Sequence, residues 1–324
     1  MSTAKLVPET WELTGDDAWR TLSQTGRRQL LKEAFMRLRV SDGFSHARSL
    51  AFMTSLVLVQ GTIVLVGTAS ALGGTDVSHA IVSAIEHAAP GPAGNVLTQA
   101  VHQARHAGAS RRYTALALGL VGTLVSSTTA MGQLERALNR IYGVEQDRPA
   151  VQKYGLALLL ALSAGALVAV SFLALGFGST VGTSLHNPAL NRAWTILRWP
   201  VALILIASAM ALLFRWCPRR HQPGWSWLAF GSAISITLWF AVTTIMGVVL
   251  RASRSFGQTY GPLAGIVALQ VWALLSSVAI LYGAAVAAQL EATRSGDIEP
   301  QDEEKVSQSE PDADATTSRV TERT

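Results

Sequence analysis

The stretch LAGIVALQVWALLSSVAILYGAAVAAQL, residues 263–290, contains no Asp, Glu, Lys or Arg. A helix of this length rises roughly 42 Å at about 1.5 Å per residue. That rise exceeds the roughly 30 Å hydrocarbon core of a bilayer. The stretch is therefore predicted to be a transmembrane helix.

Five further apolar runs have the same character: 49–72, 113–131, 154–177, 193–214 and 225–250. Only Arg198 interrupts them with a charge, close to the start of its run, where a long side chain reaches the interface. The run 113–131 is the least apolar, because Ser126 to Thr129 are all hydroxyl residues. Only 15% of all residues are charged, against about 25% in soluble domains. The sequence predicts an all-α, polytopic membrane protein with six spans.

The distribution of Lys and Arg predicts the orientation. Six spans place both termini on one side, and the segments of that side hold fifteen Lys and Arg before the tail, against seven on the other. Basic residues accumulate on the cytoplasmic side of a membrane. We therefore expect a protein of the bacterial cytoplasmic (inner) membrane with both termini in the cytoplasm.

The two ends of the chain differ from the spans. In segment 1–48, residues 27–39 combine an apolar face (Leu30, Leu31, Ala34, Phe35 and Leu38) with basic residues around it. This pattern indicates an interfacial helix on anionic lipid, rather than an arm that binds nucleic acid. Residues 292–324 are acidic with few large apolar side chains, and are predicted to form a disordered cytoplasmic tail.

The charged hairpin between the second and third runs reads LNRIYGVEQDRP, residues 138–149. Helical periodicity continues from the second run to Gly143, a residue that commonly ends helices, and Pro149 suits the start of the next helix. Glu135 lies near the membrane boundary. It is expected to pair with Arg136 or with a basic residue of another span; the alternative is handling of a proton or cation.

The stretch QLERALNRIYGVEQDRP, residues 133–149, resembles the cytoplasmic loop of the YihY/BrkB family of bacterial inner-membrane proteins. The second match is residues 255–292, with a Tyr-Gly turn, a glycine near the helix start and a Trp in mid-span. The resemblance covers roughly residues 25–293. One feature departs from the family pattern: the first span has Met53 where an aromatic residue is usual, and it has no proline.

The resemblance implies a role in envelope integrity, through transport or flipping of a lipid or another envelope component. The alternative is a membrane scaffold that recruits partners through its cytoplasmic loops and tail. The predicted lipid-headgroup site consists of Glu135, Arg136, Asn139, Arg140 and Tyr260. For the basic residues of the hairpin, the competing interpretation is that they only set the topology. The oligomeric state is not predicted.

Small residues in the last span indicate close helix packing. Gly261 and Gly265 are spaced by four, and so are Gly283 and Ala287. Uncharged polar residues of the spans form the candidates for a polar route: Gln60, Gln270, Ser276, Ser277 and the hydroxyl run at 126–129. Because none is charged, a charge-relay pump is disfavoured.

Enzyme chemistry is not predicted. Cys217 lacks an activating neighbour in the sequence, and no nucleophile or nucleotide-binding motif occurs. An old label describes the family as ribonucleases. This sequence contains no clustered carboxylates that could support metal-assisted cleavage of a phosphodiester. His102 and His106 could share a metal at their spacing, but a solvated loop helix is the preferred interpretation. No cofactor or metal is expected.

Overall fold

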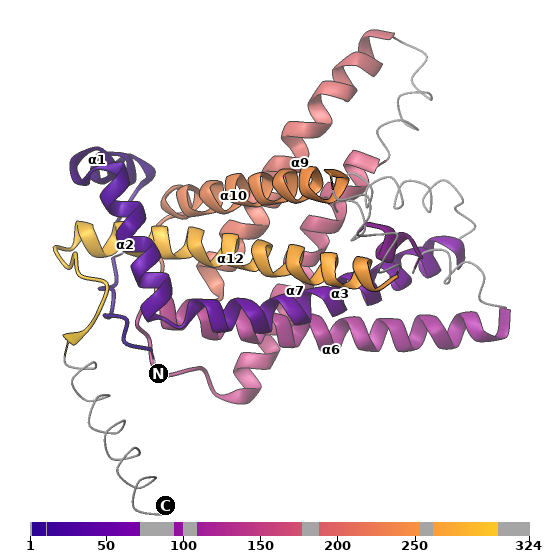
Figure 1. The fold of residues 1–324 in the computed structure, drawn as a ribbon, viewed down its shortest axis with the longest axis horizontal. Coiled ribbons are helices and arrows are strands. Elements are labelled where there is room, and N and C mark those ends of the chain that lie inside the picture. The colour runs from indigo at the N-terminus through magenta and orange to yellow at the C-terminus, as the bar shows by residue number, and fades with distance from the viewer. Residues whose placement is uncertain are drawn as a thin grey trace, which may run out of the picture.

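The computed structural model describes residues 2–10, 12–71, 94–99, 109–176, 188–252 and 262–303, and these residues are mainly helical. A short helix covers residues 94–99. The longer helices pack into an elongated bundle (Figure 1) and are α1 (Gly15–Thr25), α2 (Arg27–Val40), α3 (Gly43–Ala71), α6 (Ala109–Ile141), α7 (Ala150–Gly176), α9 (Pro188–Trp216), α10 (Trp225–Ala252) and α12 (Pro262–Arg294).

Five helices are long and apolar enough to cross a membrane. Their spanning parts are Gly43–Val64, Ala150–Phe172, Arg192–Trp216, Trp225–Leu250 and Leu263–Arg294. This confirms an all-α protein that passes through the membrane several times. The predicted second span, 113–131, lies within α6, which is long enough but less apolar than the other five. The span at 113–131, which the sequence already marks as the least apolar of the six, therefore stays a prediction.

Hydroxyl side chains of α6 have hydrogen-bond partners either in α3 or in α6 itself. The Ser126 hydroxyl donates to Gln60 Oε1 of α3 at 3.0 Å. Gly122 gives room for this contact, because a Cβ on it would lie 3.1 Å from the Gln60 side chain. The hydroxyls of Thr123 and Thr129 donate to carbonyls one turn earlier in α6, a bond common for Ser and Thr in apolar helices. Thus α6 lies beside α3 without leaving these hydroxyls unpaired.

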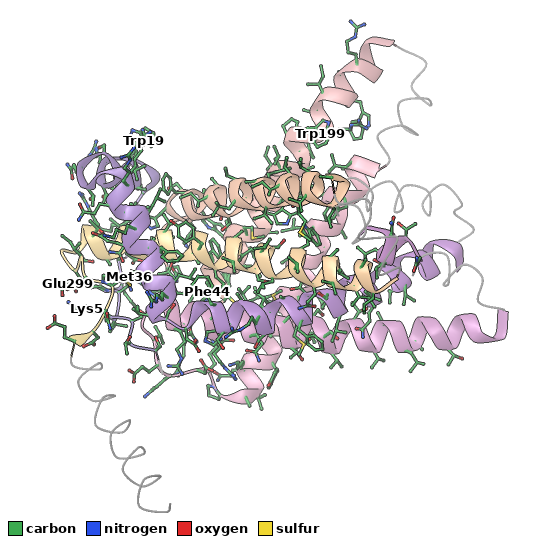
Figure 2. All side chains as sticks on the ribbon, viewed as in Figure 1. Lys5, Trp19, Met36, Phe44, Trp199 and Glu299 are labelled. Carbon is green, nitrogen blue, oxygen red and sulfur yellow. The ribbon has the colours of Figure 1, made fainter. Side chains whose placement is uncertain are left out.

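Both described ends of the chain lie at the same end of the bundle (Figure 1). There α3, α7 and α10 begin and α6, α9 and α12 end. Hydrogen bonds connect these ends to residues 3–10, including Val7 N–H to Tyr142 O and Lys5 N–H to Pro300 O, both 3.0 Å. We call this region the end layer and define it as residues 2–10, 27–42, 135–153, 216–226 and 289–302. Figure 2 shows Lys5 and Glu299 in it, far from Trp199 of α9.

The predicted interfacial helix exists as α2, but its apolar face is divided. Leu30, Ala34 and Leu38 are fully buried in the main hydrophobic core, and α2 packs against α12. Leu31 and Phe35 stay about half exposed. The prediction that the whole stripe faces lipid is wrong, because the end of α12 offers a competing apolar surface.

The start of the predicted tail is not disordered. After α12 ends, residue Gly296 adopts a φ of +87°, and the chain turns back toward residues 3–5. Ala4 pairs with Gln301 in an antiparallel bridge, and Lys5 Nζ lies 2.7 Å from Asp297 Oδ1. The prediction of disorder over 292–324 is therefore wrong for residues 292–303, and residues 304–324 lie outside the described part of the chain.

Helices α10 and α12 approach closely at two glycines. A Cβ on Gly231 would lie 2.9 Å from both Ala287 Cβ and Gly283 O. A Cβ on Gly283 would overlap the Ser235 side chain and lie 2.6 Å from Gly231 O. Small residues allow membrane helices to pack with their backbones near each other. The predicted packing role of Gly283 and Ala287 is confirmed.

We predict that Gly283→Ala lowers the stability of the protein by about 1–3 kcal/mol, because the backbone of α10 leaves no room for the methyl group. Gly165→Ala in α7 is the matched control, since a Cβ there meets nothing within 4 Å. That control should be neutral or stabilise by about 0.5–1 kcal/mol. Thermal unfolding in detergent measures both, and equal midpoints for the two variants would contradict the packing account.

Candidate functional site

The hairpin after α6 begins with a left-handed glycine. Gly143 has a φ of +74°, and its N–H donates to Arg140 O while Val144 N–H donates to Asn139 O at 2.8 Å. These two bonds form a Schellman motif. A Cβ on Gly143 would also lie 2.6 Å from Lys5 O. The predicted helix stop is confirmed, and it additionally makes room for residues 5–6.

Glu135 is buried, with 2% of its surface exposed, and it pairs with a residue of the hairpin. Arg148 Nη1 donates to Glu135 Oε1 at 3.0 Å and to Cys217 O at 2.8 Å. Arg148 Nη2 donates to Pro218 O at 2.9 Å. Glu135 thus forms an ion pair within the protein, as expected, but its partner is Arg148 rather than Arg136 or a basic residue of another span. This arginine joins the hairpin to the end of α9.

Asn139 is fully buried and its amide connects two loops. Its Nδ2 donates to Asp147 Oδ1 at 3.1 Å, and its Oδ1 accepts the N–H of Arg219 at 2.8 Å. Asp147 also accepts from Lys153 Nζ at 2.8 Å. Partial burial opposes ionisation of Asp147, but the bonds from Lys153 and Asn139 outweigh it and lower the pKa of Asp147. The carboxylate therefore stays charged.

A second buried ion pair lies at the end of α12. Arg220 Nη2 donates to Glu291 Oε1 at 2.7 Å, and both side chains are essentially buried. Thr10 Oγ1 donates to the same carboxylate, and Arg220 also donates to Pro8 O at 3.1 Å. The guanidinium lies 4.6 Å from the centre of the Tyr142 ring, a cation–π distance. Sequence reasoning missed this pair; adjacent Arg219 and Arg220 near a polar span end were its only signal.

Arg37 of α2 is fully buried in the end layer. Its Nε donates to Gln289 Oε1 at 2.7 Å, and its Nη1 donates to Lys5 O at 3.0 Å and Ile141 O at 3.3 Å. Burial lowers the pKa of Arg37 to about 10. The guanidinium thus holds α2, α6, α12 and the N-terminal segment together.

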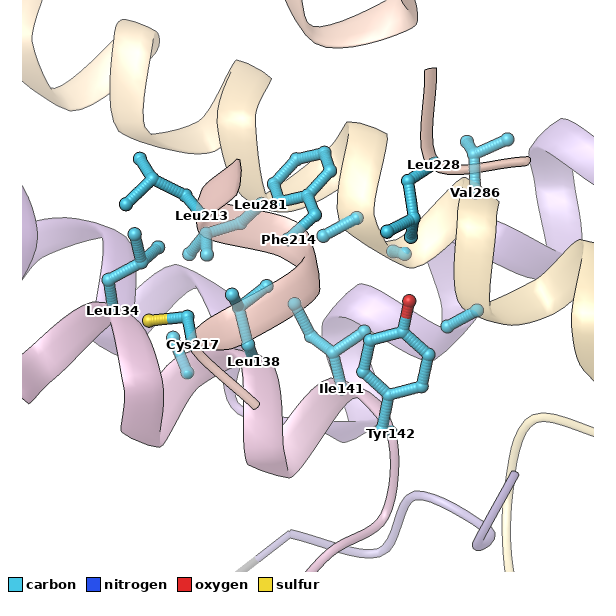
Figure 3. Close-up of a cluster of buried hydrophobic side chains, with 14 of the residues drawn as sticks. Leu134, Leu138, Ile141, Tyr142, Leu213, Phe214, Cys217, Leu228, Leu281 and Val286 are labelled. Carbon is cyan, nitrogen blue, oxygen red and sulfur yellow. The ribbon is translucent and has the colours of Figure 1, made fainter. Parts of the chain in front are cut away.

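An apolar cluster supports the end layer from the membrane side. Leu138, Ile141, Phe214, Leu228 and Leu281 meet there from α6, α9, α10 and α12 (Figure 3). The Tyr142 ring lies at its edge. Because the apolar cluster and the ion pairs involve the same helix ends, each restricts the geometry of the other.

The predicted site residues have different surroundings. Glu135 and Asn139 face protein partners, whereas the Arg136 side chain is half exposed and 3.4 Å from Asp147. Arg140 is partly exposed. A headgroup-binding role for Arg136 and Arg140 stays a prediction. Tyr260, Gly261, His102 and His106 lie outside the described residues, and Gly265 is buried in α12.

The chemistry of the end layer is that of a structural joint. Its two buried carboxylates each face an arginine, so neither is placed as a general base. Burial raises the pKa of the Cys217 thiol, which disfavours the nucleophilic thiolate. Among the described residues, no three His, Cys, Asp or Glu side chains are grouped to hold a metal ion.

A family model described as virulence factor BrkB matches residues 34–308. The chain belongs to the BrkB family. The matched range includes both buried ion pairs of the end layer, and it confirms the resemblance found in residues 133–149 and 255–292.

Curated proteins include several similar to this BrkB-family chain. The putative ribonuclease-like protein YfkH of Bacillus subtilis is 24% identical over 266 residues, which cover 80% of the chain and 94% of YfkH. UPF0761 membrane proteins of Stenotrophomonas maltophilia and Pseudomonas aeruginosa are 26% and 28% identical over 55% of the chain. The chain spans 42% and 43% of the length of these two relatives. No solved structure matches it.

We predict that Glu291→Gln lowers stability by about 3–5 kcal/mol, because it leaves the buried Arg220 guanidinium without its counter-charge. Glu9→Gln is the control, since the Glu9–His221 pair is exposed and exposed pairs contribute little. Thermal unfolding in detergent measures both variants. Equal unfolding midpoints for Glu291→Gln and Glu9→Gln would show that the buried pair does not hold the end layer together.

Proposed function

We propose that this BrkB-family protein moves a lipid or another amphiphilic envelope component across the bacterial cytoplasmic membrane, with both termini in the cytoplasm. The observation that carries the proposal is a set of paired, uncharged polar side chains on α3. Ser55 Oγ donates to Gln270 Oε1 of α12 at 3.0 Å, and Gln60 accepts from Ser126 of α6. One helix thus presents polar groups to two neighbours.

The depth of these pairs supports a route for headgroups. Ser55 and Gln60 lie twelve and seventeen residues after Gly43, roughly 18 and 26 Å along α3 at about 1.5 Å per residue. Ser276 of α12 adds a buried hydroxyl that has no hydrogen-bond partner among the described residues. Moving a polar headgroup through hydrocarbon is costly unless hydrogen-bonding groups replace water. Polar side chains in mid-span lower that cost.

The surface of the end layer supports contact with anionic lipid. Leu31 and Phe35 stay exposed beside the basic residues Arg28, Lys32 and Arg39, which are also exposed. Basic residues near a leaflet surface each contribute about 1 kcal/mol of attraction to anionic lipid. We propose that α2 lies on the cytoplasmic leaflet, which agrees with the excess of Lys and Arg on this side.

The proposal predicts protein-dependent movement of fluorescent phospholipid between leaflets of reconstituted liposomes, measured by chemical quenching of the outer leaflet. Gln60→Leu combined with Gln270→Leu should slow the movement at least about tenfold, since roughly 1.4 kcal/mol of lost stabilisation corresponds to that factor. Thr237→Val is the control, because the Thr237 hydroxyl of α10 donates to Ala233 O of its own helix. Liposomes in which no tested lipid moves faster than in protein-free ones would contradict the function.

A scaffold function is the second candidate. It is favoured by the attachment of residues 297–302 to the rest of the end layer. Residues 297–302 attach to residues 3–5, so anything that follows residue 303 leaves from the end layer. A scaffold that works through its tail needs residues 304–324, whereas a transporter core needs only the attached part.

Two truncations separate these candidates. We predict that removal of 304–324 leaves thermal stability and lipid movement unchanged. Removal of 297–324 should lower the unfolding midpoint, because residues 3–5 lose their antiparallel partner and Lys5 loses Asp297. Loss of lipid movement on removal of 304–324 alone would contradict the transporter assignment of the core.

A further inference from the structure

A second, smaller hydrophobic cluster lies in the half of the bundle away from the end layer. Its buried members are Leu97, Ala268, Leu269 and Trp272. Partly buried residues of α3 and α10 pack around them: Leu58, Val59, Trp239, Met246 and Leu250. The cluster therefore joins three long helices around one residue of the short helix 94–99.

Leu97 is buried in this cluster, with only 3% of its surface exposed. The helix 94–99 reads GNVLTQ. Its Val96 and Leu97 pack in the cluster, whereas Asn95 and Gln99 are exposed. The side-chain hydrogen bond that the described residues show for it is internal, from Thr98 Oγ1 to Gly94 O. Within the described residues, no hydrogen bond or ion pair joins residues 94–99 to α3, α10 or α12. Its described contacts with the long helices are those of the apolar side chains Val96 and Leu97.

The surface that Leu97 covers is suited to a hydrocarbon chain. None of its side chains is charged, and two of them are tryptophans whose ring centres are 6.3 Å apart. The one polar atom of Trp272 is already satisfied, because its Nε1 donates to Thr243 Oγ1 at 3.1 Å. On α12, the neighbouring Leu263, Ile266 and Val267 are exposed, so an apolar surface continues from the cluster to the outside of the bundle.

We propose that residues 94–99 plug an acyl-chain site between α3, α10 and α12, and that the chain of a membrane amphiphile enters the site when Leu97 leaves it. The inference rests on the proposed function and names its substrate class: an amphiphile with at least one hydrocarbon chain. The hydrocarbon chain competes with Leu97 for the same apolar surface, whereas the headgroup of the amphiphile contacts the polar pairs of α3.

Site-directed labelling in nanodiscs tests the plug without relying on transport. The full chain carries Cys217→Ser and Leu97→Cys, and reacts with a charged maleimide with or without saturating lysophospholipid. We expect labelling at position 97 to rise at least tenfold with the lysophospholipid and to stay unchanged with its chain-free headgroup. Asn95→Cys, on the exposed side of the same helix, is the control and should react equally fast in all conditions. No rise at position 97 would overturn the proposal.

A second measurement keeps Leu97 in place. Wild-type protein in nanodiscs is photolysed with a lysophospholipid that carries a diazirine at the end of its chain. Adducts should concentrate at Trp239–Leu250 and Ala268–Trp272, and fall when Ala268→Phe fills the site. Adducts confined to lipid-facing residues such as Leu159 and Leu162 of α7 would overturn the site.

The two proposals fail separately. If the amphiphile increases labelling at position 97 but no lipid moves in any liposome assay, the acyl-chain site is supported and the transport function is rejected. If lipid moves rapidly but the amphiphile does not change labelling at position 97, the transport function is supported and the plug is rejected.

Discussion

A buried carboxylate requires a buried cation, and Glu291 meets Arg220 where four segments of the chain converge. The carboxylate belongs to the end of α12, the arginine to the loop between α9 and α10, the Tyr142 ring to the end of α6, and Thr10 to the N-terminal segment. Removing one partner of such a pair costs far more than the pair contributes to stability. The pair therefore fixes which loops meet, and the remaining bonds of the end layer refine that arrangement.

Elsewhere in the end layer, arginine side chains also satisfy buried polar groups of several segments. Arg148 donates to Glu135 and to three carbonyls at the end of α9 and directly after it. Arg37 donates to two carbonyls and to Gln289. An arginine has five donors in a fixed planar geometry, so one residue serves several loops. Among the described residues of the half away from the end layer, the contacts between helices include the uncharged pairs of α3 and the cluster around Leu97. The proposed route and plug lie in that half.

Much of the fold is readable from composition, because hydrocarbon selects long uncharged helices and little else. The helix stop at Gly143 and the close packing of Gly283 were also predictable, since both depend on local spacing. The Glu291–Arg220 pair was not, because its members are 71 residues apart and only the folded chain brings them together. The ordered residues 292–303 were missed for the same reason: their acidic composition indicates disorder, but Lys5 and the N-terminal backbone supply partners. At α2, the sequence showed an apolar face without showing that α12 would cover half of it.

The N-terminal segment is an integral part of the end layer, which joins six helix ends. Hydrogen–deuterium exchange of the full chain in nanodiscs measures this directly at the amides of Thr3, Lys5 and Val7, which donate to Val40, Pro300 and Tyr142. We expect these three amides to exchange orders of magnitude more slowly than those of a free chain, at rates similar to the amides of Gly143 and Val144. Exchange of residues 3–7 at the rate of an unstructured peptide would contradict it.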